Sequence, residues 1–401
     1  MTRFGEAYSL RRVELRELKR RFQSVYGRPA DGAVRAPGRV NLIGEHTDYN
    51  DGLVLPIAIN RQTVALFARR SDRTVQLASL QAGGDIVAVS LDEPIAPAEP
   101  AWANYGRGVA TGLLAAGVAL VGADVLFDSD IPLGGGLGSS AALEVTSASA
   151  LLEAAGQSRH AGIAPTALAQ ICQQAEHDFA GAPCGIMDQS IAIMARAGQA
   201  MLLDCRSGQV RHVPFDDPDA VLLVADTQVR HAIAGGGYAL RQQQCRQAAE
   251  GLGVAALRDA DLPAVQSALA SGKLDAQQFK RARHVVGEIA RTQEAAEVLG
   301  EGDYKRFGEL MTASHASLRD DYEVSCEELD AIVDASVAIP GVYGARMTGG
   351  GFGGCAIILA HVSQAERIME IVQQTFAARF GRSCPIFATP AAAGAGPMAI
   401  P

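Results

Sequence analysis

Apolar residues near the start of the chain recur at the spacing of an α-helix. Leu15, Leu18, Phe22 and Val25 stand among basic and acidic residues, which is the pattern of a helix with one buried face. We therefore expect a helix over residues 9–26 that packs against the rest of the fold and takes no part in chemistry.

The first half of the chain continues as short strand-like runs interrupted by helical segments. Runs rich in apolar and β-branched residues predict strands at 34–40, 53–59, 63–67, 74–77, 86–90 and 123–128. Helical spacing and length predict helices at 102–116 and 164–180, and an amphipathic helix that begins with Ser139 or Ser140 as its N-cap. We therefore expect a sheet in the N-terminal third of the chain.

The second half is mostly helical. Strands are predicted at 199–204, 210–213, 220–226, 342–346, 355–359 and 385–389. Helices are predicted at 238–252, 279–299, 304–314, 327–339 and 363–380. We place a boundary near residue 205, which gives an N-terminal unit of 1–205 and a C-terminal unit of 206–390. The last residues, 391–401, are small and include glycine and proline, so we expect a loose tail.

The bulk composition narrows the class of partner. The chain has 401 residues, of which 48% are hydrophobic, and this is enough for sizeable cores. Its net charge of −9 argues against a nucleic-acid or anionic-membrane surface, since either needs clustered lysine and arginine. No apolar run approaches the roughly 20 residues that span a bilayer, and the first residues are too polar for a signal peptide. We expect a cytoplasmic protein that acts on small molecules.

A glycine-rich segment, IPLGGGLGSSAAL at residues 131–143, is the most distinctive stretch of the chain. Its glycines allow positive φ angles and a close approach to a ligand, and the N-terminus of the following helix favours an anion. A serine hydroxyl there could reach a phosphate-bound Mg²⁺. The segment lacks the lysine of a Walker A loop, so another residue must supply positive charge. The pattern predicts a nucleoside triphosphate site, and the alternative is a flexible turn without a ligand.

A cluster of polar residues at 39–52 is unlike any other part of the chain. It reads RVNLIGEHTDYNDG and contains Glu45, His46 and Asp48. Sugar hydroxyls both donate and accept hydrogen bonds, so a site of several polar side chains suits a sugar and rejects the wrong epimer. The alternative is a solvated turn that ends in the sequence NDG.

Two carboxylates flank a break that is rich in glycine and proline after the predicted helix at 164–180. Glu176 lies near the end of that helix and Asp188 lies twelve residues later, so a turn could bring both to one site. Mg²⁺ prefers hard oxygen ligands and takes one or two carboxylates, which suits Glu176. Asp188 stands next to apolar residues and is a candidate base. The alternative for each is a solvated acid at a helix end.

A second glycine-rich segment, GARMTGGGFGGC at residues 344–355, contains a G-x-G-x-x-G match. The residues after it are apolar and strand-like, whereas a dinucleotide-binding loop must open a helix. We therefore expect a hairpin whose backbone approaches a ligand. The chain also lacks the H-R-D and D-F-G motifs of protein kinases.

These segments together resemble one family. GRVNLIGEHTDYNDGLVLP, at 38–56, is similar to the galactokinase signature. PLGGGLGSSAALE, at 132–144, and GARMTGGGFGGC resemble the ATP loop and the third motif of the GHMP small-molecule kinases. The resemblance, to the galactokinase branch of that family, implies an α+β fold of two lobes. It implies a mixed-sheet N-terminal lobe, a ferredoxin-like C-terminal lobe and an active site in the cleft between them.

The resemblance also implies an activity and a set of site residues. The activity is phosphorylation of galactose at its C1 hydroxyl by MgATP, the first committed step of galactose catabolism, in a monomer or weak oligomer. By the resemblance Asp188 is the catalytic aspartate, Arg39 lies beside the transferring phosphoryl group, and Ser140 and Glu176 hold Mg²⁺. The implied sugar contacts are Glu45, His46, Asp48, Gly185 and Tyr238. The implied ATP contacts are Gly134, Gly135, Gly136, Leu137, Gly138, Ser139, Ser140, Ala141 and Trp102.

One departure from the family pattern, a second hypothesis for Trp102 and two alternative functions accompany this interpretation. Gly138 stands where many members of the family have the first of three serines, and Trp102 could equally serve core packing. The first alternative is another GHMP kinase, for N-acetylgalactosamine or a non-sugar alcohol. The second is a catalytically silent galactose sensor, although Asp188, Arg39 and the Ser140–Ala141 pair, which such a protein could lose, are all present.

Overall fold

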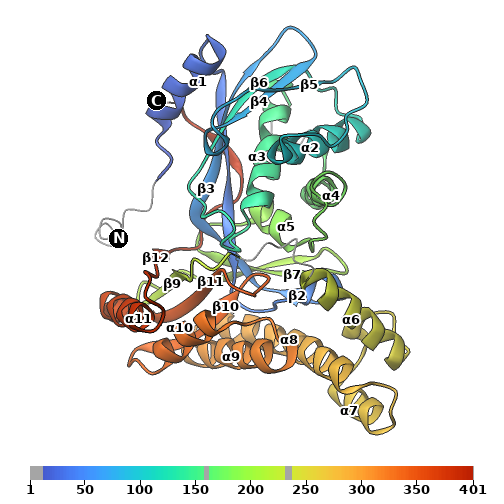
Figure 1. Cartoon of the computed structure of the whole chain (residues 1–401), viewed down its shortest axis with the longest axis vertical. Coiled ribbons are helices and arrows are strands. Elements are labelled where there is room, and N and C mark those ends of the chain that lie inside the picture. Colours follow the sequence, from blue (N-terminus) through green and yellow to red (C-terminus); the bar gives the residue numbers. More distant parts are fainter. Residues whose placement is uncertain (1–11, 158–161, 231–236, 401) are drawn as a thin grey trace.

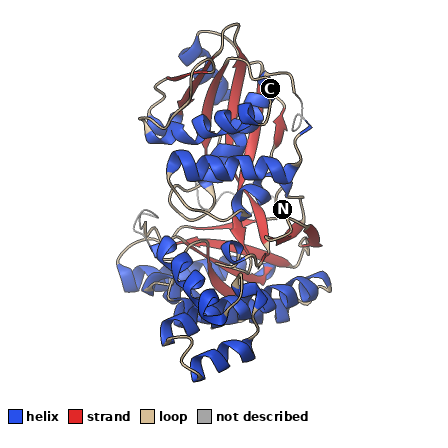
Figure 2. Ribbon diagram, turned by 90° about the vertical axis from the view of Figure 1, so that its right-hand side faces the viewer, coloured by secondary structure: helices blue, strands red, loops and turns tan. Residues whose placement is uncertain are grey.

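The structure, a computed structural model, describes residues 12–157, 162–230 and 237–400. Two lobes are stacked along the long axis, the upper one built from the first part of the chain and the lower one from the later part (Figure 1). Helices pack against strands in both lobes (Figure 2), which confirms the expected two-lobed α+β fold. The boundary near residue 205 stays a prediction, because β7 (Gln199–Asp204) and β8 (Val210–Pro214), from its two sides, pair with each other.

The sheet of the upper lobe has the strand order β13-β1-β3-β6-β4-β5 among the described residues. Its strands are β1 (Gly32–Asn41), β3 (Pro56–Arg69), β4 (Thr74–Ser79), β5 (Val87–Ser90), β6 (Ala123–Ser129) and β13 (Gly396–Met398). The β4–β6 pair is parallel and the other pairs are antiparallel, so the sheet is mixed, as expected. The predicted strands at 53–59 and 63–67 are wrong in extent. The short β2 (Leu53–Val54) is separate, whereas β3 runs unbroken because it pairs with β1 along most of its length.

Helices cover both faces of this sheet (Figure 1). They are α1 (Leu15–Tyr26) on one face, and α2 (Asn104–Ala115), α3 (Ser139–Ala154) and α4 (Pro165–Ala175) on the other, with α5 (Met187–Met194) below α3. Side chains of β3 alternate between the two cores: Val64 and Leu66 pack in the cluster with α1, whereas Ala65 and Phe67 belong to the cluster with α2 and α3. The predicted helix at 9–26 is thus α1, although residues 9–11 lie outside the described residues.

The start of α3 differs from its prediction. Its N-cap is Gly138 in the left-handed region, with φ of 73°, and no side chain caps the helix. Ser139 and Ser140 are its first two residues, so neither is the N-cap. The helix is also not amphipathic, because α2, α4, α5 and strands β1 and β3 surround it and bury residues on all its sides. Because Gly138 is the cap, both serines lie in the first turn of α3, directly after the glycine-rich loop.

The sheet of the lower lobe has the order β10-β11-β9-β12 within the described residues, and all its pairs are antiparallel. Its strands are β9 (Ala220–Asp226), β10 (Val342–Thr348), β11 (Cys355–His361) and β12 (Ile386–Thr389). Its helices are α6 (Gly237–Leu252), α7 (Leu262–Ala270), α8 (Ala276–Gly300), α9 (Tyr304–Ser317), α10 (Glu327–Val337) and α11 (Ala365–Phe380). The β10–β11 hairpin confirms that the second glycine-rich segment joins two strands. None of the helices in the described part of the chain is both long and apolar enough to span a bilayer.

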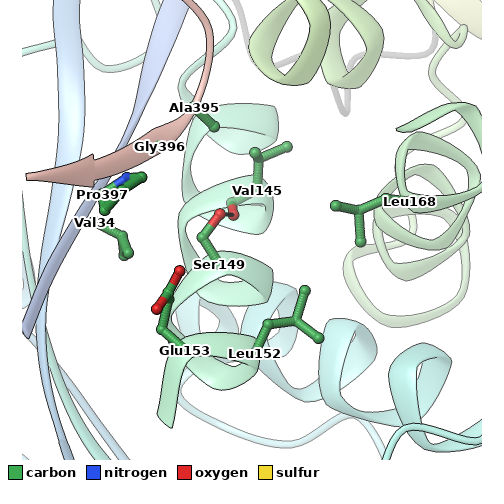
Figure 3. Close-up of a pocket in the computed structure, with 9 residues that line it drawn as sticks. All are labelled: Val34, Val145, Ser149, Leu152, Glu153, Leu168, Ala395, Gly396 and Pro397. Carbon is green, nitrogen blue, oxygen red and sulfur yellow. Dashed lines mark hydrogen bonds between the residues drawn. The ribbon is translucent and has the colours of Figure 1, made fainter. Parts of the chain in front are cut away.

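The expectation of a loose tail at 391–401 is wrong. Gly396–Met398 form β13, which pairs with β1 at the edge of the upper sheet. The close-up of this region shows Ala395, Gly396 and Pro397 against Val34 of β1 and Val145 of α3 (Figure 3). A Cβ at Gly394 would lie 2.6 Å from the carbonyl oxygen of Ile193, so the small residues here allow close backbone packing.

Candidate active site

Arg39 and Asp188, the expected catalytic pair, lie in direct contact. Nε and Nη2 of Arg39 donate to Oδ1 and Oδ2 of Asp188 at 2.7 and 2.5 Å, a two-bond geometry that orients both groups. Arg39 follows a shift of register in β1, and Asp188 lies in the first turn of α5, where the helix dipole favours a carboxylate. The side chain of Arg39 is buried and that of Asp188 is 21% exposed, so the carboxylate can be reached by a ligand.

The glycine-rich loop rests against Arg39. Nη1 of Arg39 donates to the carbonyl oxygen of Gly136 at 2.5 Å, and its backbone N–H donates to that of Leu137 at 2.9 Å. Gly38 permits this approach, since a Cβ at that position would lie 2.7 Å from the oxygen of Leu137. The positive charge that the loop itself lacks is therefore supplied by β1.

The hairpin between β10 and β11 packs against the same loop. A Cβ at Gly349 would lie 2.8 Å from the carbonyl oxygen of Gly136, and a Cβ at Gly354 would lie 2.9 Å from that of Gly135. Gly349 and Gly354 have φ angles of 84° and 77°, which residues with side chains rarely adopt. The two glycine-rich segments thus meet backbone to backbone, and a side chain at either hairpin position would push the loop away.

Ser140 and Glu176, the expected metal ligands, lie side by side, so that the Ser140 side chain favours the charged form of the Glu176 carboxylate. Nε2 of Gln189 donates to Oε2 of Glu176 at 2.8 Å and to Oε2 of Glu144 at 3.0 Å. Burial raises the pKa of Glu176, and burial followed by the charge of Glu176 raises the pKa of Glu144 well above its usual range. Among the described residues, Oε1 of Glu144 has no hydrogen-bond partner. Two buried carboxylates this close favour a bound cation.

The chemistry of these donors fits Mg²⁺. Across the described ranges, no three His, Cys, Asp or Glu side chains are grouped so that they could hold a metal ion. Mg²⁺ does not need such a cage, because it takes one or two carboxylates and completes its octahedral shell with phosphate oxygens and water. A hydroxyl from Ser140 and a carboxylate from Glu176, next to an anion-binding loop, match that partial shell.

Asp48 and Gly185 are in contact beside Asp188. A Cβ at position 185 would overlap the Asp48 carboxylate, so a glycine is required for that carboxylate to stay where it is. Burial, followed by the charge of Asp188, raises the pKa of Asp48 to about 7. Burial, followed by the charge of Asp48, raises the pKa of Tyr238 at the start of α6. The structure therefore brings these expected sugar contacts together around the expected base.

His46 joins the same group from a tight turn. Its φ is 64°, and Nδ2 of Asn50 donates to its carbonyl oxygen at 2.9 Å. Nδ1 of His46 is hydrogen-bonded to the Tyr49 hydroxyl, which is also hydrogen-bonded to the Tyr322 hydroxyl, both at 2.7 Å. The rings of His46 and Tyr238 are 5.5 Å apart. Burial lowers the pKa of His46 to about 3, so the imidazole is neutral at physiological pH.

Glu45 points into the protein, toward β10. Its Oε1 accepts the backbone N–H of Gly349 at 2.8 Å, and its Oε2 accepts Nδ2 of Asn41 at 2.8 Å and Nη1 of Arg346 at 2.5 Å. The single hydroxyl hydrogen of Thr348 is shared between the oxygen of Asn41 at 3.1 Å and Oε1 of Glu45 at 3.3 Å. Both oxygens of Glu45 thus accept from donors of the protein, and the sugar contact of Glu45 stays a prediction.

Trp102 lies away from these groups, in the short 3₁₀ helix Ala101–Ala103 that precedes α2. Its ring packs edge-on against Phe127, with centroids 6.4 Å apart, at the margin of the upper core. Core packing, one of its two expected uses, is therefore observed, and the contact with adenine stays a prediction.

The sequence interpretation missed the residues that support this site. They are Glu144, Gln189, Tyr49, Thr348 and Arg346. Helical spacing could have found Glu144, which lies one turn after Ser140, and Gln189 directly follows Asp188. Arg346 and Thr348 lie in the second glycine-rich segment, which the sequence marked as a hairpin near a ligand, but no local pattern showed that they contact Glu45 and Asn41.

The raised pKa of Asp48 predicts a pH-dependent loss of stability. Its carboxyl has a pKa of 3.8 ordinarily and about 7 in the fold, so between these values the folded protein binds more protons than the unfolded chain. The contribution of Asp48 to the free energy of unfolding is therefore full below its ordinary pKa and decreases as the pH rises to about 7. In urea unfolding at about pH 5 and about pH 7.5, Asp48→Asn should lose less stability over the interval than the wild type. Equal losses in the two proteins would contradict the assignment.

Three family models match the chain. The galactokinase galactose-binding signature covers residues 20–69, the GHMP kinase N-terminal domain covers 104–196, and the GHMP kinase C-terminal domain covers 295–378. The first contains the polar cluster with Glu45, His46 and Asp48, and the second contains the glycine-rich loop and Asp188. The matched regions thus include the side chains that the structure gathers.

Curated galactokinases are similar to this protein over nearly its whole length. Galactokinase from Homo sapiens is 46% identical over 387 residues, which is 95% of this chain and 96% of that protein. Galactokinase from Chloroflexus aurantiacus is 43% identical over 96% of this chain and 97% of its own. Among solved structures, Lactococcus lactis galactokinase complexed with galactose aligns with a TM-score of 0.90 and 32% identity, over 95% of this chain and 99% of its own. Mevalonate kinase from Methanococcus jannaschii, at 17% identity and a TM-score of 0.63, shares the fold.

Proposed function

Because this chain belongs to the galactokinase family of the GHMP kinases, we propose that it transfers the γ-phosphoryl group of ATP to the C1 hydroxyl of galactose. The products are galactose 1-phosphate and ADP. The observation that carries the assignment is the Arg39–Asp188 pair, which contacts the glycine-rich loop on one side and the polar cluster around Asp48 on the other.

Asp188 acts on the sugar hydroxyl. It orients the C1 hydroxyl for in-line attack on the γ-phosphorus and receives its proton. Both oxygens of Asp188 already accept hydrogen bonds from Arg39, so orientation and electrostatics account for as much of its role as proton abstraction.

Arg39 acts on the phosphoryl group. A guanidinium has five N–H groups, and three of them are used on Asp188 and on the oxygen of Gly136. The remaining two are available to oxygens of the transferring phosphoryl group, whose negative charge Arg39 stabilises. Its fixed position also keeps the loop and the base in one arrangement.

Ser140 and Glu176 would hold Mg²⁺, and Gln189 fixes the Glu176 carboxylate for that purpose. When bound, Mg²⁺ neutralises charge on the β- and γ-phosphates. The backbone amides of residues 134–141 bind the phosphates, and Trp102 lies against the adenine.

The sugar hydroxyls are bound by side chains of the polar cluster and its neighbours. These are Glu45, His46, Asp48 and Tyr238, with Gly185 providing the space for Asp48. Nδ1 of His46 is bonded to the Tyr49 hydroxyl, so Nε2, which has no hydrogen-bond partner among the described residues, is the ring nitrogen that pairs with a sugar hydroxyl.

The glycine at position 185 gives a direct test of this arrangement. Gly185→Ala should raise the KM for galactose about tenfold or more, because the methyl group displaces the Asp48 carboxylate. The KM for ATP should change by less than about twofold. Gly300→Ala is the matched control, because a Cβ there would make only an ordinary van der Waals contact and the φ angle of Gly300 is not positive. A Gly185→Ala protein with unchanged galactose kinetics would remove Asp48 from the sugar site.

The charge and the substrates of the enzyme indicate its partners and its location in the cell. A net charge of −9 argues against binding to nucleic acid or anionic lipid, and galactose and MgATP are small, water-soluble substrates. We place it in the cytoplasm, as a monomer or weak oligomer.

A substrate panel tests the proposed function. ADP release from MgATP is measured with galactose, glucose, N-acetylgalactosamine, mevalonate and homoserine. Turnover with galactose, and little with glucose, is expected. Turnover with another alcohol in place of galactose would keep the kinase and discard the sugar assignment, whereas binding of galactose and ATP without turnover would indicate a sensor.

A further inference from the structure

A buried cluster of charged side chains lies behind the polar cluster of residues 39–52. Arg346 of β10 and Glu288 of α8 have no exposed surface, and Glu45 is 2% exposed. Nη1 of Arg346 lies 2.5 Å from Oε2 of Glu45, and its Nη2 lies 4.0 Å from Oε1 of Glu288. Removing three charges from water is costly, and apolar residues of similar volume would fill the space at lower cost. The presence of these buried charges is therefore better explained by the backbone groups that they bind than by a contribution to stability.

The cluster holds the backbone at the start of the sugar-binding turn. Oε1 of Glu288 accepts the backbone N–H of Gly44 at 3.0 Å and the hydroxyl of Ser314 at 2.5 Å. Nη1 of Arg346 also donates to the carbonyl oxygen of Asn41 at 3.2 Å. The backbone is therefore fixed on both sides of residues 42 and 43, directly before Glu45.

The same strand also supports the glycine-rich loop. Two residues after Arg346, Thr348 hydrogen-bonds to the backbone of Asn41, and the backbone N–H of Gly349 donates to Glu45. Gly349 in turn packs against Gly136. The end of β10 therefore sets the position of the sugar-binding turn relative to the loop.

We propose that Arg346 is a positioning residue for galactose, which orients Glu45 and, with Glu288, fixes the turn that presents His46 and Asp48 to the sugar. This inference rests on the proposed function. Arg346 is wholly buried and does not touch substrate, so its effect passes through Glu45 and through the backbone of the turn. Its loss should weaken galactose binding and leave ATP binding nearly unchanged.

Arg346→Lys tests the proposal because lysine keeps the charge but is one bond shorter, so its nitrogen does not reach the position of Nη1, the atom that contacts both Glu45 and the Asn41 oxygen. Its galactose Kd by calorimetry, and its KM for galactose, should rise about tenfold, with the KM for ATP within about twofold of wild type. Arg281→Lys is the matched control: Arg281 is also fully buried and paired with Glu323, but its hydrogen bonds do not reach residues 41–52. It should lose thermal stability and retain the wild-type galactose Kd.

A double-mutant cycle separates positioning from general damage. If Arg346 acts in part through Glu45, Glu45→Gln combined with Arg346→Lys should lose clearly less galactose affinity than the two single losses together. If Arg346→Lys does not fold, Glu288→Gln, which replaces the charged acceptor of the Gly44 N–H by a weaker, neutral one, should show a selective loss of the same kind.

Three results would overturn the inference. They are a wild-type galactose Kd in Arg346→Lys or, where that does not fold, in Glu288→Gln; an equal loss in Arg281→Lys; and fully additive effects in the cycle. In each case galactose turnover by the wild type would leave the proposed function intact. A wild-type protein without galactose turnover would remove that function instead.

Discussion

Replacing Asp188 by asparagine should lower kcat for galactose phosphorylation by about 10³-fold. Asparagine has the same size, but it cannot accept the hydroxyl proton, and it lacks the charge that pairs with Arg39 at 2.7 and 2.5 Å. The KM for ATP should change by less than about threefold, because the glycine-rich loop is held by Arg39 and by backbone contacts. Single-turnover kinetics with saturating ATP and galactose measure the loss at the chemical step.

Asp178→Asn is the control for that substitution. Asp178 is an exposed acid in the turn after α4, so the same chemical change there should leave kcat at the wild-type value. Thermal melting of both variants checks that they fold. Near-normal turnover by Asp188→Asn would show that another group acts on the hydroxyl.

The second large effect is expected at Arg39. Arg39→Lys should lower kcat by about 10²-fold, because an ammonium group is a point charge that cannot bond both Asp188 oxygens and the Gly136 oxygen at once. The galactose Kd should change little, since Arg39 is assigned to the phosphoryl group. Steady-state kinetics and galactose calorimetry on the same preparation separate the two effects.

Arg35→Lys provides the comparison on the same strand. Arg35 is part-buried on β1 and donates to the side chain of Gln62, and it makes no bond to the glycine-rich loop. Its substitution should leave kcat unchanged. Wild-type kcat in Arg39→Lys, or a loss of galactose binding as large as the loss of kcat, would contradict the phosphoryl role.

Much of this site was predictable because its chemistry is carried by short segments. The glycine-rich loop carries both its flexible glycines and its serine hydroxyls, and the polar cluster carries its hydrogen-bonding side chains in one short run. Residues such as Asp48 and Ser140 were therefore candidates without knowledge of the fold. Glu176 and Asp188 were found as a pair because a single turn separates them. The two-lobed fold followed from the resemblance of these segments to one family.

The supporting residues were not predictable, because long-range pairing decides them. From the sequence Arg346 is an ordinary polar residue in a predicted strand, and only the structure shows that it contacts Glu45. The hairpin was expected to approach a ligand, which stays a prediction, and the contact of its Gly349 and Gly354 with the first glycine-rich loop was not foreseen. The small residues after residue 390 looked disordered, although close packing requires them. Gly138 as the cap of α3 was missed because serine is the commoner N-cap.

The most direct test of the central claim is identification of the phosphorylated carbon by NMR, after complete turnover of galactose with MgATP. Transfer to the hydroxyl oriented by Asp188 predicts phosphorus coupling to the anomeric carbon and proton, with one ADP formed for each galactose 1-phosphate. Phosphate on any other carbon, or ADP release without a phosphorylated sugar, would contradict the account.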